Sequence, residues 1–203
     1  MGTGPIRGRL NALRWNCAAG VLRSPVSTGG ATLYQVLTKI TQGYRAHGVR
    51  RFVVLNGHGG NIPVLDQVAL DLQRQGCMLA EMNWWLMAWD LNPAWKGGHG
   101  GAEETAGVLA VNPTLVDWDS IEDMTLKPVS DEMEATGFKT VRFKGVEIPL
   151  VRPITEVTDN GWIGPDHPKN ATEAWGRDML KACAEYIADF MGAFRRVPLP
   201  DRK

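Results

Sequence analysis

Apolar and polar residues follow two different periods along this chain, and their order predicts alternating helices and strands. Residues 31–47 carry apolar side chains at helical spacing, and Gly48 supplies a residue at which such a helix can end. Residues 51–55 form a short β-branched and apolar run, which is typical of a buried parallel strand. A second helical stripe covers residues 62–75, and a second apolar run follows at 77–82. This order predicts a βαβ unit, which is expected to be right-handed.

The second half of the chain predicts a hairpin and a long terminal helix. Residues 139–150 alternate between apolar and polar positions on either side of Lys144-Gly145, which is a β-hairpin signal. Asn170 and Glu173 have the spacing of a capping box and are followed by apolar residues at spacings of three and four. The whole pattern predicts a three-layer α/β/α domain with a mostly parallel sheet and a site at the carboxyl ends of its strands.

A glycine-rich turn, Asn56-Gly57-His58-Gly59-Gly60-Asn61, joins the first predicted strand to the helix after it. His58 is thereby presented at the end of a strand where ligands usually bind in open α/β sheets. Asn61 suits the N-cap of the helix, and Pro63 suits its first turn. The glycines behind His58 allow a ligand to approach the backbone closely. Taken alone, the motif fits a functional histidine and a tight turn with an incidental histidine equally well.

A second motif, residues 97–105, again places a histidine among glycines and adds two carboxylates at the start of an apolar helix. Glu103 and Glu104 could simply stabilise the positive end of the helix dipole. Stabilisation of the helix dipole does not explain why four glycines surround His99. Histidine and glutamate are ligands of catalytic zinc, and a neutral imidazole also serves as an acid or base. The two motifs together predict the site of a metal-dependent hydrolase.

At this point the residues resemble a known family. The N-G-H-G-G-N turn, followed later in the chain by H-G-G-x-x-E-T, is similar to the motifs of the creatininase (creatinine amidohydrolase) family. Residues 30–33 and 45–51 agree with the same family, and the resemblance runs from about residue 27 to about residue 194. It implies a hydrolase that holds two divalent ions, zinc or manganese, opens a cyclic amide or related small polar ring, and assembles as a homo-oligomer, usually a hexamer.

The resemblance also implies roles for particular residues. His58 would be a metal ligand, Glu104 a ligand to the other metal, and His99 the proton donor or acceptor. Trp95 falls where the family keeps a tryptophan over the substrate, although a cluster of tryptophans is as often part of a core. Trp84, Gly59 and Gly60 are expected to contact the substrate as well. Asn56, Asn61 and Glu103 are expected to lie behind the metal ligands and hold them in position.

The chain also departs from the family pattern. The family's first strand carries a Glu-x-His pair and then an Asp that bridges the metals, but no Asp or Glu precedes Asp66 here and no Glu-x-His occurs. Two alternatives to a cyclic amidohydrolase therefore stay open: an impaired or inactive member that keeps the fold and subunit contacts, and a hydrolase that opens a carbon–carbon bond in a sugar- or inositol-derived diketone. A single-metal site of His58, His99 and Glu104 is a third arrangement, since three protein ligands suffice for catalytic zinc.

Composition narrows the class of protein. With 203 residues, 44% of them hydrophobic, the chain is long enough for one globular domain, which we expect at residues 27–196 with a tail at 197–203. A formal net charge of zero gives no reason to expect nucleic acid or an anionic surface as a partner. No stretch reaches the roughly 18 consecutive apolar residues of a membrane span. Three scattered cysteines without a C-x-x-C pair predict buried thiols in the cytoplasm.

The N-terminal part of the chain is unusually basic. Residues 1–65 contain eight Lys or Arg and no Asp or Glu. For residues 1–26 we expect the product of a truncated or frameshifted gene, with family-like sequence resuming near Ser27; a transit peptide and a solvated tail are the alternatives. Translation of the neighbouring nucleotides in all three frames tests this, because the hypothesis requires a Glu-x-His strand in another frame or just upstream.

A missing first strand has a structural consequence. A parallel sheet cannot leave an interior position empty, because the flanking strands would expose backbone groups and an apolar face. Either residues 5–25 supply a substitute strand, or the sheet ends there and a neighbouring subunit covers its edge. The run Gly20-Val21-Leu22 is short and flanked by Gly, Arg and Pro, so we expect the exposed edge, a marginally stable chain and an incomplete metal site.

Overall fold

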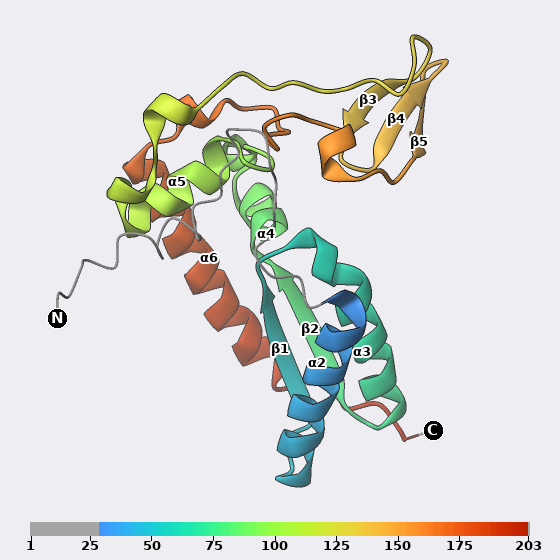
Figure 1. The fold of residues 1–203 in the computed structure, drawn as a ribbon. Coiled ribbons are helices and arrows are strands. Elements are labelled where there is room, and N and C mark those ends of the chain that lie inside the picture. The colour runs from blue at the N-terminus through green and yellow to red at the C-terminus, as the bar shows by residue number, and fades with distance from the viewer. Residues whose placement is uncertain (1–28, 203) are drawn as a thin grey trace, which may run out of the picture. The chain divides into compact units, whose positions relative to one another are not determined.

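The computed structural model describes residues 29–202, which form two compact units (Figure 1). The sheet unit consists of residues 29–94 and 181–202, and the hairpin unit consists of residues 95–180. Helix α6 (Glu173–Phe194) contributes its first residues to the hairpin unit and the rest to the sheet unit. In the part of the chain that is described, no helix is long and apolar enough to cross a membrane.

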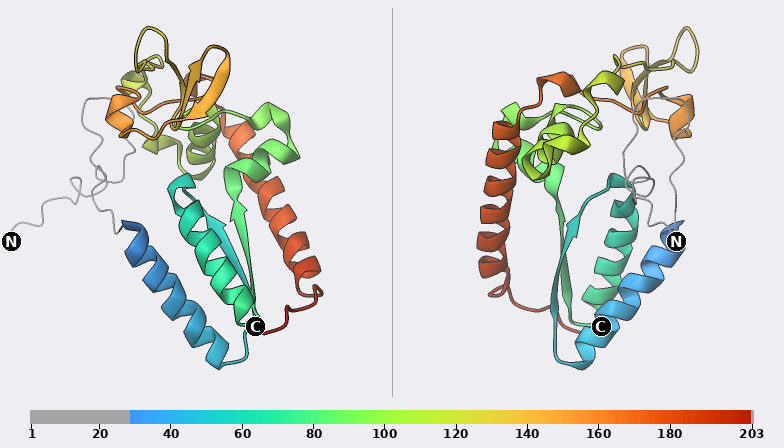
Figure 2. Two further views of the ribbon diagram at one scale, coloured as in Figure 1. Left: turned by 90° about the vertical axis from the view of Figure 1, so that its right-hand side faces the viewer. Right: turned by 60° about the vertical axis from the view of Figure 1, so that its left-hand side comes forward.

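The sheet unit is a three-layer arrangement, as the sequence predicts. Its elements before α6 are α2 (Gly29–Ala46), β1 (Arg51–Asn56), η1 (Gly59–Asn61), α3 (Ile62–Arg74), β2 (Met78–Asn83) and α4 (Trp84–Leu91). Strands β1 and β2 pair in parallel, in register from Arg51 opposite Met78 to Asn56 opposite Asn83. Helices α2 and α3 lie on one face of the two strands and α6 lies on the other (Figures 1 and 2). The predicted α/β fold with a parallel sheet is confirmed.

The core of the sheet unit lies between the strands and helices α2 and α3. Val68, Leu72 and Cys77 are almost fully buried, and Tyr34, Leu37, Phe52 and Leu79 pack against them. Gly48 and Gly76 follow α2 and α3 with φ of +88° and +71°. Both helices therefore end at a left-handed glycine, as expected, because only glycine adopts this conformation without strain.

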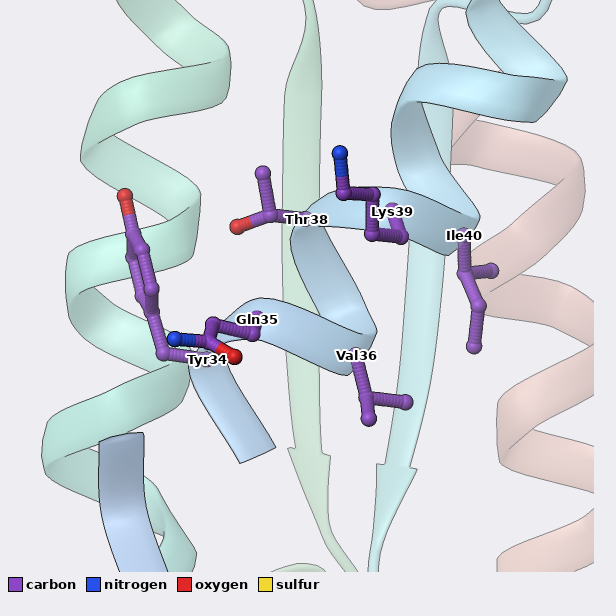
Figure 3. A pocket seen from close by; sticks show the side chains of 6 residues that line it. All are labelled: Tyr34, Gln35, Val36, Thr38, Lys39 and Ile40. Atoms are coloured by element: carbon purple, nitrogen blue, oxygen red, sulfur yellow. The ribbon is translucent and has the colours of Figure 1, made fainter. Parts of the chain in front are cut away.

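Helix α2 exposes part of the apolar stripe that the sequence expects to be buried. Figure 3 shows the hollow that runs along this helix, with Tyr34 pointing toward α3 while Val36 and Ile40 point to the other side. Val36, Ile40 and Tyr44 are 48%, 49% and 58% exposed. The helical period is right, but half of the stripe extends beyond the two strands, and nothing in the described part of the chain covers it.

Strand β1 has an open edge. Among residues 29–202 the parallel sheet has only β1 and β2, and no third strand pairs with either. Leu55 is 63% exposed and the four residues before it are only half-buried, although parallel strands are usually buried on both faces. The expected exposed edge stays a prediction. The alternative, a substitute strand from residues 5–25, lies outside the described residues.

The hairpin unit is built around α5 and a three-stranded antiparallel sheet. Its elements are η2 (Pro93–Trp95, whose last residue belongs here), α5 (Ala102–Val111), η3 (Pro113–Leu115), η4 (Trp118–Ser120), β3 (Glu134–Gly137), β4 (Thr140–Phe143), β5 (Val146–Pro149), η5 (Ile154–Glu156), η6 (Pro168–Asn170) and the start of α6. Ala102, Ala106, Leu109 and Ala171 form its buried cluster, with Val116 and Trp175 against them. Gly176 of α6 lies so close to α5 that an added Cβ would stand 1.8 Å from the carbonyl oxygen of Ala106.

The predicted hairpin is confirmed and has an additional strand. Lys144 and Gly145 both have positive φ, +46° and +83°, which is the geometry of a type I′ turn between β4 and β5. Strand β3 pairs antiparallel with β4 and was not expected. Its four residues, Glu134–Gly137, are too short and too polar for their own sequence to show that they are a strand.

The predicted start of the last helix is wrong by a few residues. Helix α6 begins at Glu173, and the Thr172 hydroxyl accepts a hydrogen bond from the Trp175 N–H at 3.1 Å. Asn170 instead ends η6 and donates its side-chain amide to Asp166 at 2.6 Å. Thr172 therefore caps the helix, and the capping box expected from Asn170 does not form. Cys77 and Cys183 are both buried, as expected.

Candidate active site

The turn after β1 folds His58 back onto its own backbone. His58 has extended dihedrals, φ −151° and ψ 126°, and its Nδ1 accepts a hydrogen bond from the Gly60 N–H at 3.2 Å. A Cβ on Gly60 would stand 2.8 Å from Cε1 of the same ring. The glycine at position 60 is therefore needed by the histidine cap itself, which is a structural reason that the sequence alone does not reveal.

This cap restricts what His58 can bind. A neutral imidazole that accepts a hydrogen bond at Nδ1 carries its proton at Nε2. A metal bound through Nδ1 would displace the Gly60 N–H, and a metal bound through Nε2 would require the proton to move to Nδ1. Either mode breaks the hydrogen bond that holds the turn. His58 is exposed, so such a change would not disturb the packing around it.

Asn56 connects this turn to the neighbouring strand. It is 3% exposed, and its amide donates to Asn83 at 2.6 Å and to Glu81 at 3.4 Å. Its carbonyl oxygen accepts from the His58 N–H at 3.2 Å and from the Asn61 side chain at 3.1 Å. Asn61 occupies the N-cap position of α3, but its side chain makes no capping hydrogen bond there. The capping bond expected from Asn61 is therefore wrong. Pro63 lies in the first turn, as expected.

The second turn, in the hairpin unit, holds His99 by its backbone. The His99 N–H donates to the Ile163 carbonyl and the Ile163 N–H donates to the His99 carbonyl, both at 2.9 Å. Added Cβ atoms would stand 2.4 Å from Cα of Gly164 at Gly98, and 2.2 Å from the Glu103 nitrogen at Gly97. The glycines are therefore required because the turn, the helix start and the loop around Ile163 approach each other at backbone distance.

The two glutamates of the second motif have different environments. Glu104 lies with Oε1 3.4 Å from Nδ1 of His99, and its Oε2 accepts a hydrogen bond from the Gly100 N–H at 3.1 Å. Both side chains of this pair are partly open to solvent, at 29% for His99 and 36% for Glu104. Glu103 is 1% exposed. Successive helical side chains diverge by about 100°, which places one glutamate beside the histidine and buries the other.

Sequence reasoning missed an aromatic neighbour of His99. The ring of Phe138 lies edge-on to the imidazole, with centroids 4.7 Å apart and planes at 78°. Phe138 is in the turn between β3 and β4, far from His99 along the chain. No local signal marks this residue, because the contact depends on where the hairpin packs.

The tryptophans of the linking segment lie in both units. Trp84, at the start of α4, packs edge-on against Trp85 with centroids 6.4 Å apart. Trp85, which the sequence did not single out, lies at van der Waals distance from Gly59, 3.7 Å from the position of an added Cβ. Trp95 ends η2 and is half-buried. Their role as a substrate wall stays a prediction.

The donor atoms do not form a complete metal site. In residues 29–202 no three His, Cys, Asp or Glu side chains are grouped so that they could hold a metal ion. His99 and Glu104 lie together in the hairpin unit, and His58 belongs to the sheet unit. Catalytic zinc takes three protein ligands and a water, and neither unit by itself groups three such donors among its described residues. The pair of His99 and Glu104 does fit acid–base chemistry, because a carboxylate beside one ring nitrogen orients the imidazole.

Comparison with known proteins agrees with the motifs. The pattern of the Creatininase family, described as creatinine amidohydrolase, matches residues 22–191. A creatinine amidohydrolase from Pseudomonas putida is 32% identical over 114 residues, which cover 48% of this chain and 44% of that protein. The chain thus spans less than half the length of this relative.

Solved structures show the same fold. A Bacteroides fragilis protein proposed to be a creatinine amidohydrolase superposes with a TM-score of 0.63 at 23% identity, covering 91% of this chain and 71% of that one. Creatininase itself gives 0.56 at 26% identity, with 83% and 65% covered. A creatininase variant described as Zn–Zn type gives 0.54 at 26% identity, with 82% and 64% covered. Since the family pattern covers most of its sequence, this chain is a member of the creatininase family.

Proposed function

We propose that this chain is a hydrolase that cleaves the C–N bond of a small cyclic amide, and that His99 moves the proton. The observation that carries the proposal is the pair of His99 Nδ1 and Glu104 Oε1, 3.4 Å apart, in the turn that carries the family motif. The relatives named creatinine amidohydrolase support the amide as the substrate class.

We propose a separate task for each nitrogen of His99. Because Nδ1 faces the carboxylate of Glu104, the neutral ring keeps a proton on Nδ1, and Nε2 is the nitrogen that exchanges a proton with substrate. Nε2 takes a proton from the water that attacks the carbonyl carbon and then gives it to the leaving ring nitrogen. Glu104 is itself held by the Gly100 N–H, so the pair is oriented before substrate arrives.

The metal requirement is a separate part of the proposal. We propose that a divalent ion, zinc or manganese, takes part and that His58 and Glu104 are the ligands supplied by the two motifs. A solved family member of Zn–Zn type supports zinc. His58 would bind one metal and Glu104 the other, so each metal would need further donors, since a catalytic zinc takes three protein ligands.

One observation from the sequence favours a second candidate, a non-catalytic member of the family. No Glu-x-His pair occurs in the chain, and no Asp or Glu precedes Asp66. Such a protein would keep the fold and its subunit contacts without turning over substrate.

Metal content and activity on a panel of cyclic amides separate the two candidates. The hydrolase should bind one or two zinc or manganese ions per chain and open at least one cyclic amide, and His99→Gln should abolish turnover without loss of the fold. His47→Gln, an exposed histidine after α2, is the matched control and should be silent. A chain that binds no metal and opens no substrate, at full solubility, would contradict the hydrolase and support the inert member.

We also propose that copies of the chain assemble and cover the open edge of β1. Exposed strand edges promote pairing with other chains, and Leu55 exposes 63% of its surface there. Light scattering should give a mass of several chains, and Leu55→Lys should lower it or reduce aggregation. A monomer that stays soluble and unfolds cooperatively at high temperature would show that the edge needs no partner. We propose that the assembly is cytoplasmic, because the three cysteines are scattered and form no C-x-x-C pair.

A further inference from the structure

We infer that Phe138 is a positioning residue that holds the imidazole of His99 in its productive orientation. This inference rests on the proposed function, because it concerns the proton transfer assigned to His99. The aromatic ring meets the imidazole edge-on, with centroids 4.7 Å apart and an angle of 78° between the planes. This is the preferred geometry for two aromatic rings, whose positive edge and negative face attract each other.

The hairpin fixes Phe138 firmly enough for such a role. Gly137 pairs with Thr140, which leaves only Phe138 and Lys139 in the turn between β3 and β4. Ala135 and Val141, paired across the same two strands, are 4% and 3% exposed and anchor the hairpin. The ring is therefore carried by paired and buried backbone, and its position follows that of the strands.

Three contacts then restrain His99 from different directions. Ile163 holds its backbone, Glu104 holds Nδ1 at 3.4 Å, and Phe138 contacts the ring itself. Rotation of the imidazole about its Nδ1 contact would move Nε2 across the site. The aromatic contact opposes this motion. Proton transfer requires donor and acceptor at hydrogen-bond distance, so a loosened ring lowers the rate of the chemical step.

The role predicts a specific kinetic pattern. Phe138 acts through His99, so its loss should lower kcat while KM changes by no more than about twofold. We expect Phe138→Leu to lower kcat about tenfold, since a small misplacement of a catalytic group has effects of this order or larger. Phe138→Tyr keeps the ring edge and should restore most of the rate. A residue that only stabilised the fold would not give this split.

The experiment combines kinetics with NMR of the histidine side chains. His99 resonances are identified by their loss in His99→Gln, and the ring current of Phe138 should displace them in the wild type. Phe138→Leu should remove this displacement, while Phe138→Tyr should keep it. Phe143→Leu, which alters a ring in β4 of the same hairpin, is the matched control and should leave the His99 resonances unchanged.

The outcomes separate this inference from the proposed function. Unchanged His99 resonances in Phe138→Leu, or equal changes in Phe143→Leu, would overturn the positioning role. A raised KM with unchanged kcat would also overturn it, since Phe138 would then bind substrate directly. If the wild type hydrolyses no cyclic amide, the proposed function fails. NMR alone then tests the positioning role: loss of the ring-current displacement of the His99 resonances in Phe138→Leu, retained in Phe138→Tyr, supports it, and unchanged His99 resonances in Phe138→Leu refute it.

Discussion

Oε1 of Glu104 lies 3.4 Å from Nδ1 of His99, and the other oxygen of the same carboxylate accepts the Gly100 N–H at 3.1 Å. Both oxygens of Glu104 are thus used within the turn that carries His99. A metal ion bound at Glu104, as proposed, would have to share the carboxylate with these two contacts.

Glu104 and Glu103 should respond differently to the same substitution. Glu104→Gln removes the negative charge 3.4 Å from Nδ1 of His99, so we expect a loss of bound metal and of turnover. Glu103→Gln should leave metal content nearly unchanged, because Glu103 is 1% exposed and buried away from solvent. Metal analysis and activity measurements of both variants check this. Loss of metal in Glu103→Gln but not in Glu104→Gln would reverse the assignment.

His58→Ala tests the first motif. If His58 is a ligand, the variant should contain less metal while its fold is largely kept, since the side chain is exposed. Removal of the bond from Gly60 should cost about 1 kcal/mol of unfolding free energy or less. Metal content and urea unfolding give the two readouts, with His47→Ala as the control at the opposite end of β1. Unchanged metal content would remove His58 from the site.

Gly176 and Gly192 of helix α6 test how closely α6 packs, because one glycine lies against α5 and the other lies in open space. An added Cβ at Gly176 would stand 1.8 Å from a backbone oxygen of α5, while at Gly192 nothing lies within 4 Å. Gly176→Ala should lower the unfolding free energy by about 3 kcal/mol or more through overpacking. Gly192→Ala should raise it by about 0.5–1 kcal/mol, because alanine favours the helix. Thermal unfolding of both variants checks the prediction, and equal effects would mean that α5 and α6 are not in close contact at Gly176.

Tyr34 should make the stability of the sheet unit depend on pH. Its hydroxyl donates to Oδ2 of Asp71 at 2.6 Å, and this bond, followed by that from Gln67, holds the pKa of Asp71 below its ordinary value. The same bond raises the pKa of Tyr34. Asp71 therefore stabilises the fold fully above its unfolded pKa, about 4, and this stabilisation is lost as the pH falls through the lower folded pKa. The contribution of Tyr34 is complete below about pH 10 and is lost as the pH rises through its raised pKa.

Tyr34→Phe tests this coupling. The pKa of Asp71 should rise toward its ordinary value, and the unfolding free energies of variant and wild type should converge as the pH falls below about 4. Urea unfolding across that range is the measurement. Tyr44→Phe, an exposed tyrosine of the same helix, should follow the wild type at every pH. A constant difference between Tyr34→Phe and wild type at all pH values would contradict the coupling.

Helix ends, turns and strand boundaries could be predicted from the sequence, because each depends on residues that are neighbours in the chain. The ends of α2 and α3 follow from Gly48 and Gly76, and the β4–β5 turn follows from Lys144 and Gly145, because positive φ is a local requirement. The two histidine motifs likewise indicated the family, since their glycines are required close to each histidine. The boundaries of β1 and β2 agree with the apolar runs to within a residue.

The contacts of His99 and the burial of the α2 stripe could not be predicted from the sequence, because they depend on residues that are distant in the chain. The pairing of His99 with Ile163 and the contact with Phe138 join segments that carry no common pattern. The helical period of α2 was evident, but whether Val36 and Ile40 are buried depends on the width of the sheet beneath them. Periodicity shows that a side chain belongs to an apolar face, while burial of that face requires a partner whose position only the folded chain determines.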